Sequence, residues 1–224
     1  MHVLPRVATG PKLAAGHVSL TDADELAPSQ VGDDELVTEQ RFARVVLDSH
    51  TSQFVEFASL EVCGGSLADS DWYRTNWVDV ALEGVDAANA AFTESGLKRI
   101  AWRNSRLVGI GLSGCTLHDV AHLDCIATMA NFRFAHLQRV EFVDCDLSGA
   151  DFTNARLQEV SFLGCRLEGA TFSHATSNRV LLHGGELEGI RGLGGLKGAT
   201  IHADDITTIA QEMAAELGIQ LTAG

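Results

Sequence analysis

Apolar residues recur at every fifth position from His50 to Gly189. The centre of each five-residue unit has a number ending in 2 or 7, and most centres are Leu, Phe, Trp or another apolar residue. The residue two positions earlier is small or β-branched, as Ala150 is before Phe152. A short period that holds its phase over most of a chain predicts a stacked repeat architecture, with both patterned positions pointing inward.

This unit resembles that of the pentapeptide-repeat family, in which a small residue is followed by Asp or Asn, by Leu or Phe, and by two variable residues. Copies close to that pattern begin at Ala130, Cys145 and Ala150. The resemblance covers roughly residues 40–190. It implies an all-β fold, a right-handed quadrilateral β-helix (pentapeptide-repeat solenoid) in which four units make one coil, here with a short C-terminal helix.

A coil of twenty residues should sort residue types into columns, and the sequence does so. One column of centres is largely aromatic, with Phe132, Phe152 and Phe172 at its end. The 28 units of residues 50–189 predict seven coils, or a rod of about 34 Å at the spacing of neighbouring strands. His122 and Ala127 fit the inward positions poorly, and we expect a local distortion or a bound water there.

The two ends of the chain depart from the repeat. Residues 1–34 contain all three prolines and are expected to form an N-terminal extension or cap, partly disordered, before a repeat body over residues 35–190. Residues 191–224 are expected to form a strand-helix-strand cap or dimerisation module. The apolar stripe of its helix consists of Ile206, Ile209, Ala210, Met213 and Leu217.

That stripe has two interpretations. It could plug the last coil, or it could make a homodimer. Dimerisation is favoured, because the ending resembles that of the topoisomerase-protecting members of the family, MfpA and Qnr, which dimerise through their C-terminal modules.

Motifs of enzymes are absent from the sequence, which has no phosphate-binding loop, no H-E-x-x-H and no G-x-S-x-G. Cys125, Cys145 and Cys165 are spaced by twenty residues at an inward position, which favours small core residues over metal ligands. Cys63 alone should point outward. We therefore expect a non-enzymatic protein with no catalytic residues, no cofactor and no metal site.

The formal net charge is −14, and basic patches with interleaved aromatic residues are absent, which disfavours direct binding of nucleic acid. Residues 50–189 hold 18 acidic and 10 basic residues, and two adjacent faces of the coil carry the excess. The acidic residues expected to form an interaction surface there are Glu61, Glu83, Asp86, Asp124, Glu141, Asp144, Asp146 and Glu168.

The resemblance to MfpA and Qnr implies that this surface acts as a DNA mimic, which binds DNA gyrase or topoisomerase IV and modulates or protects it against fluoroquinolones. Mimicry would be partial, since B-DNA carries about 20 charges over about 34 Å. Acidity that only provides solubility is the alternative interpretation of these faces.

A second class of function remains open. Leu123, Val143 and Leu163 should stack outward as an apolar stripe, which can mark a protein interface. The alternative function is therefore a scaffold or immunity-type protein with an unrelated protein partner. The sequence has neither a run of eighteen apolar residues nor a secretory signal, so we expect no membrane association and a cytoplasmic location.

Overall fold

The chain turns a corner at residues whose numbers end in 4 or 9, where the backbone adopts a positive φ. The structure, a computed structural model, describes residues 20–220, and 22 non-glycine residues in it have positive φ, among them Asp79 and Met129 with φ of 58°. Glycine takes this place elsewhere, as at Gly149, because it adopts a positive φ at little cost. Four such corners in twenty residues give a four-sided coil.

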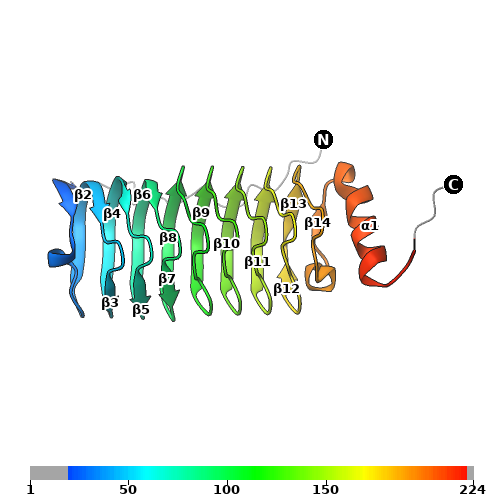
Figure 1. Ribbon diagram of the computed structural model, residues 1–224, viewed down its shortest axis with the longest axis horizontal. Helices are drawn as coiled ribbons and strands as arrows, with labels where there is room; N and C mark the ends of the chain where they lie inside the picture. The colour runs from blue at the N-terminus through cyan, green and yellow to red at the C-terminus, as the bar shows by residue number, and fades with distance from the viewer. Residues whose placement is uncertain (1–19, 221–224) are drawn as a thin grey trace.

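Parallel strands stacked along one axis build the rod in Figure 1. A long sheet has the order β1-β2-β4-β6-β8-β9-β10-β11-β13-β14, with β12 also paired to β11, and a second sheet has the order β3-β5-β7. The strands are β1 (Thr21–Leu26), β2 (Leu36–Val46), β3 (Thr51–Gln53), β4 (Glu56–Ser66), β5 (Asp71–Tyr73), β6 (Asn76–Asp86), β7 (Ala91–Thr93), β8 (Gly96–Arg103), β9 (Thr116–Leu123), β10 (His136–Val143), β11 (Arg156–Leu163), β12 (Thr176–Asn178), β13 (Leu181–His183) and β14 (Thr200–Ile201).

The register confirms the twenty-residue coil. Phe142 pairs with Phe162, and Leu97 pairs with Leu117. Beyond the named strands, isolated bridges such as Asn131 to Asp151 keep the same offset. Residues of one column therefore lie directly above one another along the rod.

The number of coils exceeds the sequence-based expectation of seven. The solenoid has about nine turns, because β1 pairs with β2 before the repeat begins and β14 pairs with β13 after it ends. Leu26 and Val31 are buried in the first turn although no five-residue pattern surrounds them. An end coil needs only one neighbour to pack against, so it can form without the repeat signature.

Stacked aromatic rings fill the interior, as the columns predict. Phe152 lies between Phe132 at 4.7 Å and Phe172 at 4.8 Å, with nearly parallel rings. The column containing Phe142 and Phe162 meets this one edge to face. All five rings are at most 1% exposed, and offset stacking with edge-to-face contacts is the favoured packing of aromatic rings.

His122 sits in this interior without the local distortion that the sequence led us to expect. The ladder runs unbroken from Trp102 through His122 to Phe142, and the imidazole stacks on Phe142 at 4.5 Å. Burial lowers the pKa of His122 to about 3, so the ring is neutral at physiological pH. Its Nδ1 is buried and has no hydrogen-bond partner among the described residues.

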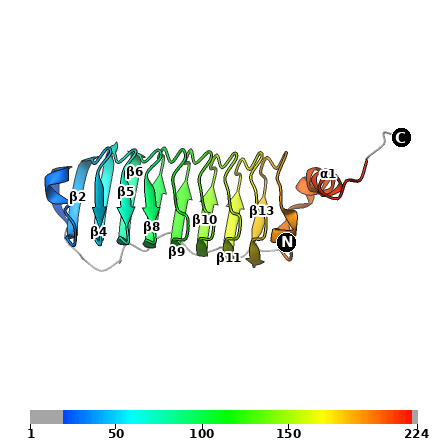
Figure 2. The ribbon, with the colours of Figure 1, turned by 60° about the horizontal axis from the view of Figure 1, so that its bottom comes forward.

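Beyond the last coil the chain forms α1 (Ile206–Glu216), which projects at the end of the rod in Figure 2. Among residues 20–220, three short 3-10 helices lie near the ends of the solenoid: η1 (Pro28–Gln30), η2 (Leu193–Leu196) and η3 (Ala203–Asp205). Of the expected strand-helix-strand order, the first strand and the helix are present, as β14 and α1, but the second strand is not seen over the described residues. β14 continues the solenoid by pairing with β13, while Ile219 and Gln220 form no strand and Leu221 lies outside the described part.

Three carboxylates attach α1 and η3 to the solenoid. Asp205 accepts the main-chain N–H of Gly184, Glu212 that of Gly189, and Glu216 that of Leu193. These side chains satisfy N–H groups that point out of the last coil, where no further coil supplies carbonyls. Within residues 20–220, no helix is long and apolar enough to cross a membrane.

Candidate protein-interaction surface

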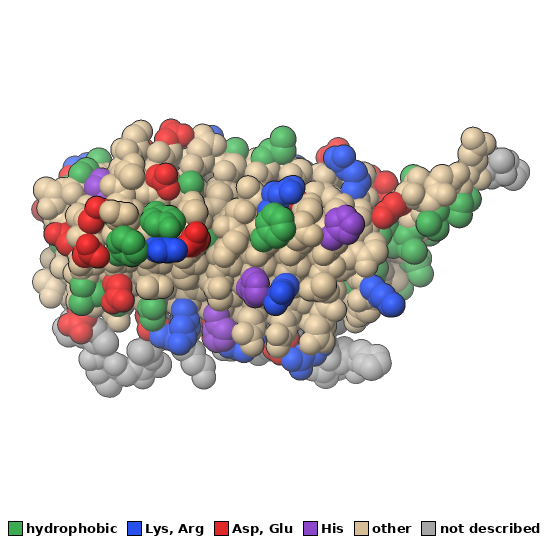
Figure 3. Space-filling model, turned by 90° about the horizontal axis from the view of Figure 1, so that it is seen from below, with side chains coloured by type: hydrophobic (Ala, Val, Ile, Leu, Met, Phe, Trp, Pro, Cys, Tyr) green, Lys and Arg blue, Asp and Glu red, His purple; other side chains and the backbone are tan. Residues whose placement is uncertain are grey.

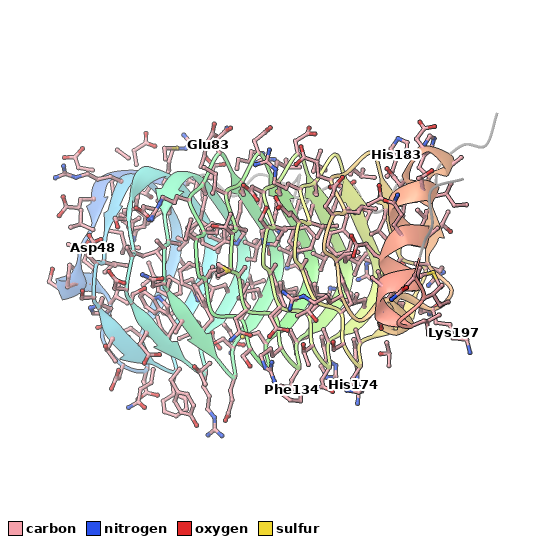
Figure 4. The ribbon with its side chains drawn as sticks, turned by 45° about the vertical axis from the view of Figure 1, so that its right-hand side comes forward. Asp48, Glu83, Phe134, His174, His183 and Lys197 are labelled. Carbon is pink, nitrogen blue, oxygen red and sulfur yellow. The ribbon has the colours of Figure 1, made fainter. Side chains whose placement is uncertain are left out.

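The outward residues of each coil fall on four faces, which we name A to D in chain order around the coil. Figure 4 shows Glu83 and His183 of face A projecting from one side of the rod, and Phe134 and His174 of face C projecting from the opposite side. In one complete coil, face A comprises residues 141–144, face B residues 146–149, face C residues 151–154 and face D residues 156–159.

Faces A and B carry all eight acidic residues predicted to form the interaction surface, and the structure divides these residues into two groups. Glu83, Asp124, Asp144 and Glu168 are exposed and have no ion-pair partner among the described residues. Glu61, Asp86, Glu141 and Asp146 are half-buried. The first group is the part of the predicted surface that is available to a partner.

Neighbouring arginines form ion pairs with three members of the second group. Glu61 pairs with Arg41 at 2.6 Å, Asp86 with Arg106 at 3.1 Å, and Asp146 with Arg166 at 3.5 Å. The fourth, Glu141, has no such partner, and burial raises the pKa of its carboxyl group. Each pair joins residues twenty apart, so the coil spacing determines which charges meet.

Face D shows the same principle in a complete ladder. The column at its corner alternates acid and base: Asp79, Arg99, Asp119, Arg139, Glu159 and Arg179. Arg99 contacts Asp79 and Arg139 contacts Asp119, both at 2.5 Å, and Arg179 pairs with Glu159. The hydrogen bond from Arg139 lowers the pKa of Asp119. This side of the rod therefore carries little net charge.

A further acidic region lies at the N-terminal end, where the sequence predicted an extension or cap and no interaction surface. Residues 20–49 hold eight acidic and two basic residues. Seen from below in Figure 3, acidic side chains gather toward this end, whereas basic and histidine side chains lie mostly over the other half. A charge count of residues 22–48 would have found the region, which lies on the coils formed by β1 and β2.

The predicted apolar stripe exists, but its side chains are only half-exposed. Leu123 pairs with Val143 and Val143 with Leu163, so the three stack on face A. More exposed apolar side chains lie on other faces of the same coil. Ile126 is 52% and Met129 69% exposed on face B, and Phe134 is 53% exposed on face C.

The apolar stripe of α1 had two predicted roles, plugging the last coil and forming a dimer, and its residues differ in which role they fit. Ile209 is 6% exposed and belongs to the core of the rod, so its assignment to a dimer interface is corrected: it plugs the last coil. Ile206, Met213 and Leu217 are 48% to 71% exposed, and Ala210 is exposed too. An apolar groove of about 280 Å³ runs between α1 and the end of β14.

Potential nucleophiles and metal ligands are dispersed or buried. Over residues 20–220, no three His, Cys, Asp or Glu side chains are arranged to share a metal ion. Cys63 is exposed, while the other four cysteines are buried. The Cys165 thiol donates to the carbonyl oxygen of Phe142 at 3.4 Å, and burial raises the pKa of Cys115 to about 11. These buried thiols behave as small core residues.

Comparisons with known proteins bear mainly on the repeat. Residues 115–191 match a family model described as a pentapeptide repeat region. HetL, a pentapeptide repeat protein involved in heterocyst differentiation regulation from the cyanobacterium Nostoc sp. strain PCC 7120, is 15% identical with a TM-score of 0.42. That match covers 81% of this chain and 90% of HetL.

Two other solved structures are also similar. Full-length QnrB1, a plasmid-mediated fluoroquinolone resistance protein, is 15% identical with a TM-score of 0.28, over 86% of this chain and 98% of that one. Rfr23 from the cyanobacterium Cyanothece 51142 is 22% identical with a TM-score of 0.22, over 54% of this chain and 63% of that one. A search of curated protein sequences finds no match.

Proposed function

We propose that this chain, a pentapeptide-repeat protein, is a non-enzymatic binding protein whose faces A and B dock into a basic groove of a protein partner. DNA gyrase or topoisomerase IV is the leading candidate partner, with the solenoid acting as a partial DNA mimic that modulates or protects the enzyme. Its family resemblance supplies the candidate, and the surface of the rod supplies the mode of binding.

The observation that carries the proposal is the separation of charge between the faces. Over residues 76–189, the acidic residues without ion-pair partners lie on faces A and B, whereas the acids of face D are paired in a ladder. A rod with one acidic side presents a directional field, which raises the rate of encounter with a basic groove. Acidity that served solubility alone would need no such separation.

A supercoiling assay tests the partner directly. Gyrase is assayed with and without a fluoroquinolone, in the presence of micromolar protein. We expect inhibition of supercoiling or relief from the drug. If neither occurs, gyrase is not the partner, and the scaffold or immunity-type function becomes the leading proposal.

Charge reversal tests the surface. The variant Asp124→Lys, Asp144→Lys, Glu168→Lys alters exposed carboxylates that make no ion pair, so the solenoid should fold normally. We avoid Asp146 because it pairs with Arg166 and accepts two hydrogen bonds from Ser148. The variant should lose the effect on gyrase through slower association.

A matched control makes the same charge change elsewhere. Glu39, Glu56 and Asp71 lie on faces C and D, are exposed, and make no ion pair among the described residues. Their triple replacement by lysine should leave the effect on gyrase within about twofold of the native protein, because exposed charges far from an interface contribute little to binding. Equal loss in both variants would mean that net charge, not faces A and B, governs binding.

We further propose that the protein forms a homodimer through α1. Ile206, Met213 and Leu217 expose apolar surface that the last coil does not cover, and burying such surface favours association. Met213→Glu should give monomers in sedimentation experiments. An unchanged mass would assign α1 to closing the rod.

A further inference from the structure

One unpaired position interrupts the ion pairs on face B. Ile126 lies in a column between Arg106 and Asp146, its bridge partners in the neighbouring coils. Both neighbours bond away from it: Arg106 pairs with Asp86, and Asp146 pairs with Arg166. The side chain of Ile126 is therefore left uncovered, 52% exposed, between two ion-paired groups.

Met129 lies three residues later on the same face and is 69% exposed. Its backbone has a φ of 58° at a corner where the adjoining coils have Gly109 and Gly149. The thioether lies over Gly149, and a Cβ at that position would come within 2.5 Å of the sulfur. A long apolar side chain here combines a disfavoured backbone conformation with exposure to water.

Folding does not account for these two side chains. Neither contributes to the packed interior, and the column of Met129 is otherwise occupied by Ser, Asp, Asn and Gly. Carboxylates without ion-pair partners flank the site, with Asp124 and Asp144 at the corner shared with face A and Glu168 further along face B. An apolar centre within a charged rim is the usual arrangement of a binding hot spot.

We propose that Ile126 and Met129 form an apolar anchor within the acidic surface, and that it inserts into an apolar pocket flanked by lysines or arginines on the protein partner. This inference deepens the proposed function, on which it rests for the identity of the acidic surface. The anchor slows dissociation, while the carboxylates speed association. Methionine suits this role because its flexible thioether adapts to an irregular pocket.

Two synthetic helical peptides test the anchor without requiring gyrase. They have equal length and equal positive charge; one carries leucines along one face, and the other carries serines in their place. The native protein should bind the leucine peptide about tenfold more tightly, since only that peptide can bury the anchor. In the variant Ile126→Ser, Met129→Gln the difference should shrink to about twofold or less.

Phe134→Gln is the matched control, because Phe134 is equally exposed and also has a φ of 58°. It should keep the full preference for the leucine peptide. The charge-reversal variant should weaken both peptides alike. A preference that survives in the anchor variant, or that is lost equally in Phe134→Gln, would overturn the proposal.

A second measurement separates this proposal from the choice of partner. If native protein binds gyrase, the anchor variant should dissociate about tenfold faster with an unchanged association rate. Unchanged dissociation would overturn the anchor while leaving gyrase as partner. If native protein has no effect on gyrase but still prefers the leucine peptide, gyrase is rejected as the partner. The anchor is then retained for another basic partner.

Discussion

Glu212 of α1 accepts the main-chain N–H of Gly189 at 2.9 Å. One coil earlier, the N–H of Gly169 donates to the carbonyl oxygen of Glu188 at the same distance. The carboxylate thus takes the place that the carbonyl of a further coil would occupy. A side chain ends the backbone ladder and leaves Gly189 with a partner.

Removing this carboxylate should loosen the end of the rod. We expect Glu212→Ala to lower the free energy of unfolding of the last coil by about 1 kcal/mol, because Gly189 loses its acceptor. Amide hydrogen exchange should show faster exchange at Gly189 and in β13. Gln211→Ala, at an exposed neighbouring position, should change neither, and equal effects would point to loss of helix stability instead.

Truncating one ring of the aromatic column should be far more damaging. Phe152 is fully buried between two parallel rings, so Phe152→Ala should cost about 3–5 kcal/mol through lost contacts and a cavity. Urea unfolding measures the loss. Phe134→Ala removes an exposed ring and should stay within about 0.5 kcal/mol of native stability; similar losses would contradict the assignment of Phe152 to the core.

His122 should make stability depend on pH. Its pKa is lowered by burial from 6.5 to about 3, so between these values the unfolded chain binds a proton that the folded chain does not. Stability is therefore present above pH 6.5 and is lost as the pH falls toward 3. From pH 7 to pH 5 the loss attributable to His122 is about 2 kcal/mol.

Replacing His122 by leucine tests this linkage. Urea unfolding at pH 7 and pH 5 should show a smaller loss in His122→Leu than in native protein, because leucine takes up no proton. His136→Gln removes an exposed histidine and should leave the native pH dependence unchanged. Identical pH dependence in all three proteins would show that folding does not lower the pKa of His122.

The cysteines should differ sharply in reactivity. A thiolate is the reactive form, and the exposed Cys63 should be labelled by a water-soluble maleimide in native protein. Cys115 and the column of Cys125, Cys145 and Cys165 should react only after unfolding. Mass spectrometry of the labelled protein counts the modified sites, and rapid native labelling of Cys145 would contradict its burial.

The sequence could predict the interior because inward positions face one environment throughout. Phe132, Phe152 and Phe172 lie where the twenty-residue columns placed them. The sequence did not predict that the strands beginning at Thr21 and Thr200 belong to the solenoid, because they lack the five-residue phase, although a strand before the C-terminal helix was expected. Pairing with one neighbouring coil suffices to order these strands. A strand that occurs once leaves no periodic pattern in the sequence.

Surface chemistry was only partly predictable. Columns show which charges lie one coil apart, but a side chain bonds upward or downward according to its rotamer. Arg166 contacts Glu186 at 2.7 Å and Asp146 at 3.5 Å. Both acids lie one coil from Arg166, so spacing alone could not tell which of them forms the closer ion pair. In the same way, the amphipathic pattern of α1 could not tell that Ile209 turns toward the solenoid while Met213 does not.

The twenty-residue offset between paired charges has an evolutionary consequence. Insertion or deletion of one five-residue unit would keep apolar side chains inward and corners in phase. It would nevertheless rotate everything downstream by a quarter turn, so that Arg139 would no longer stand above Asp119. Such an indel could assemble new combinations of outer residues while conserving the interior, giving this architecture a route to new recognition that point mutation alone does not offer.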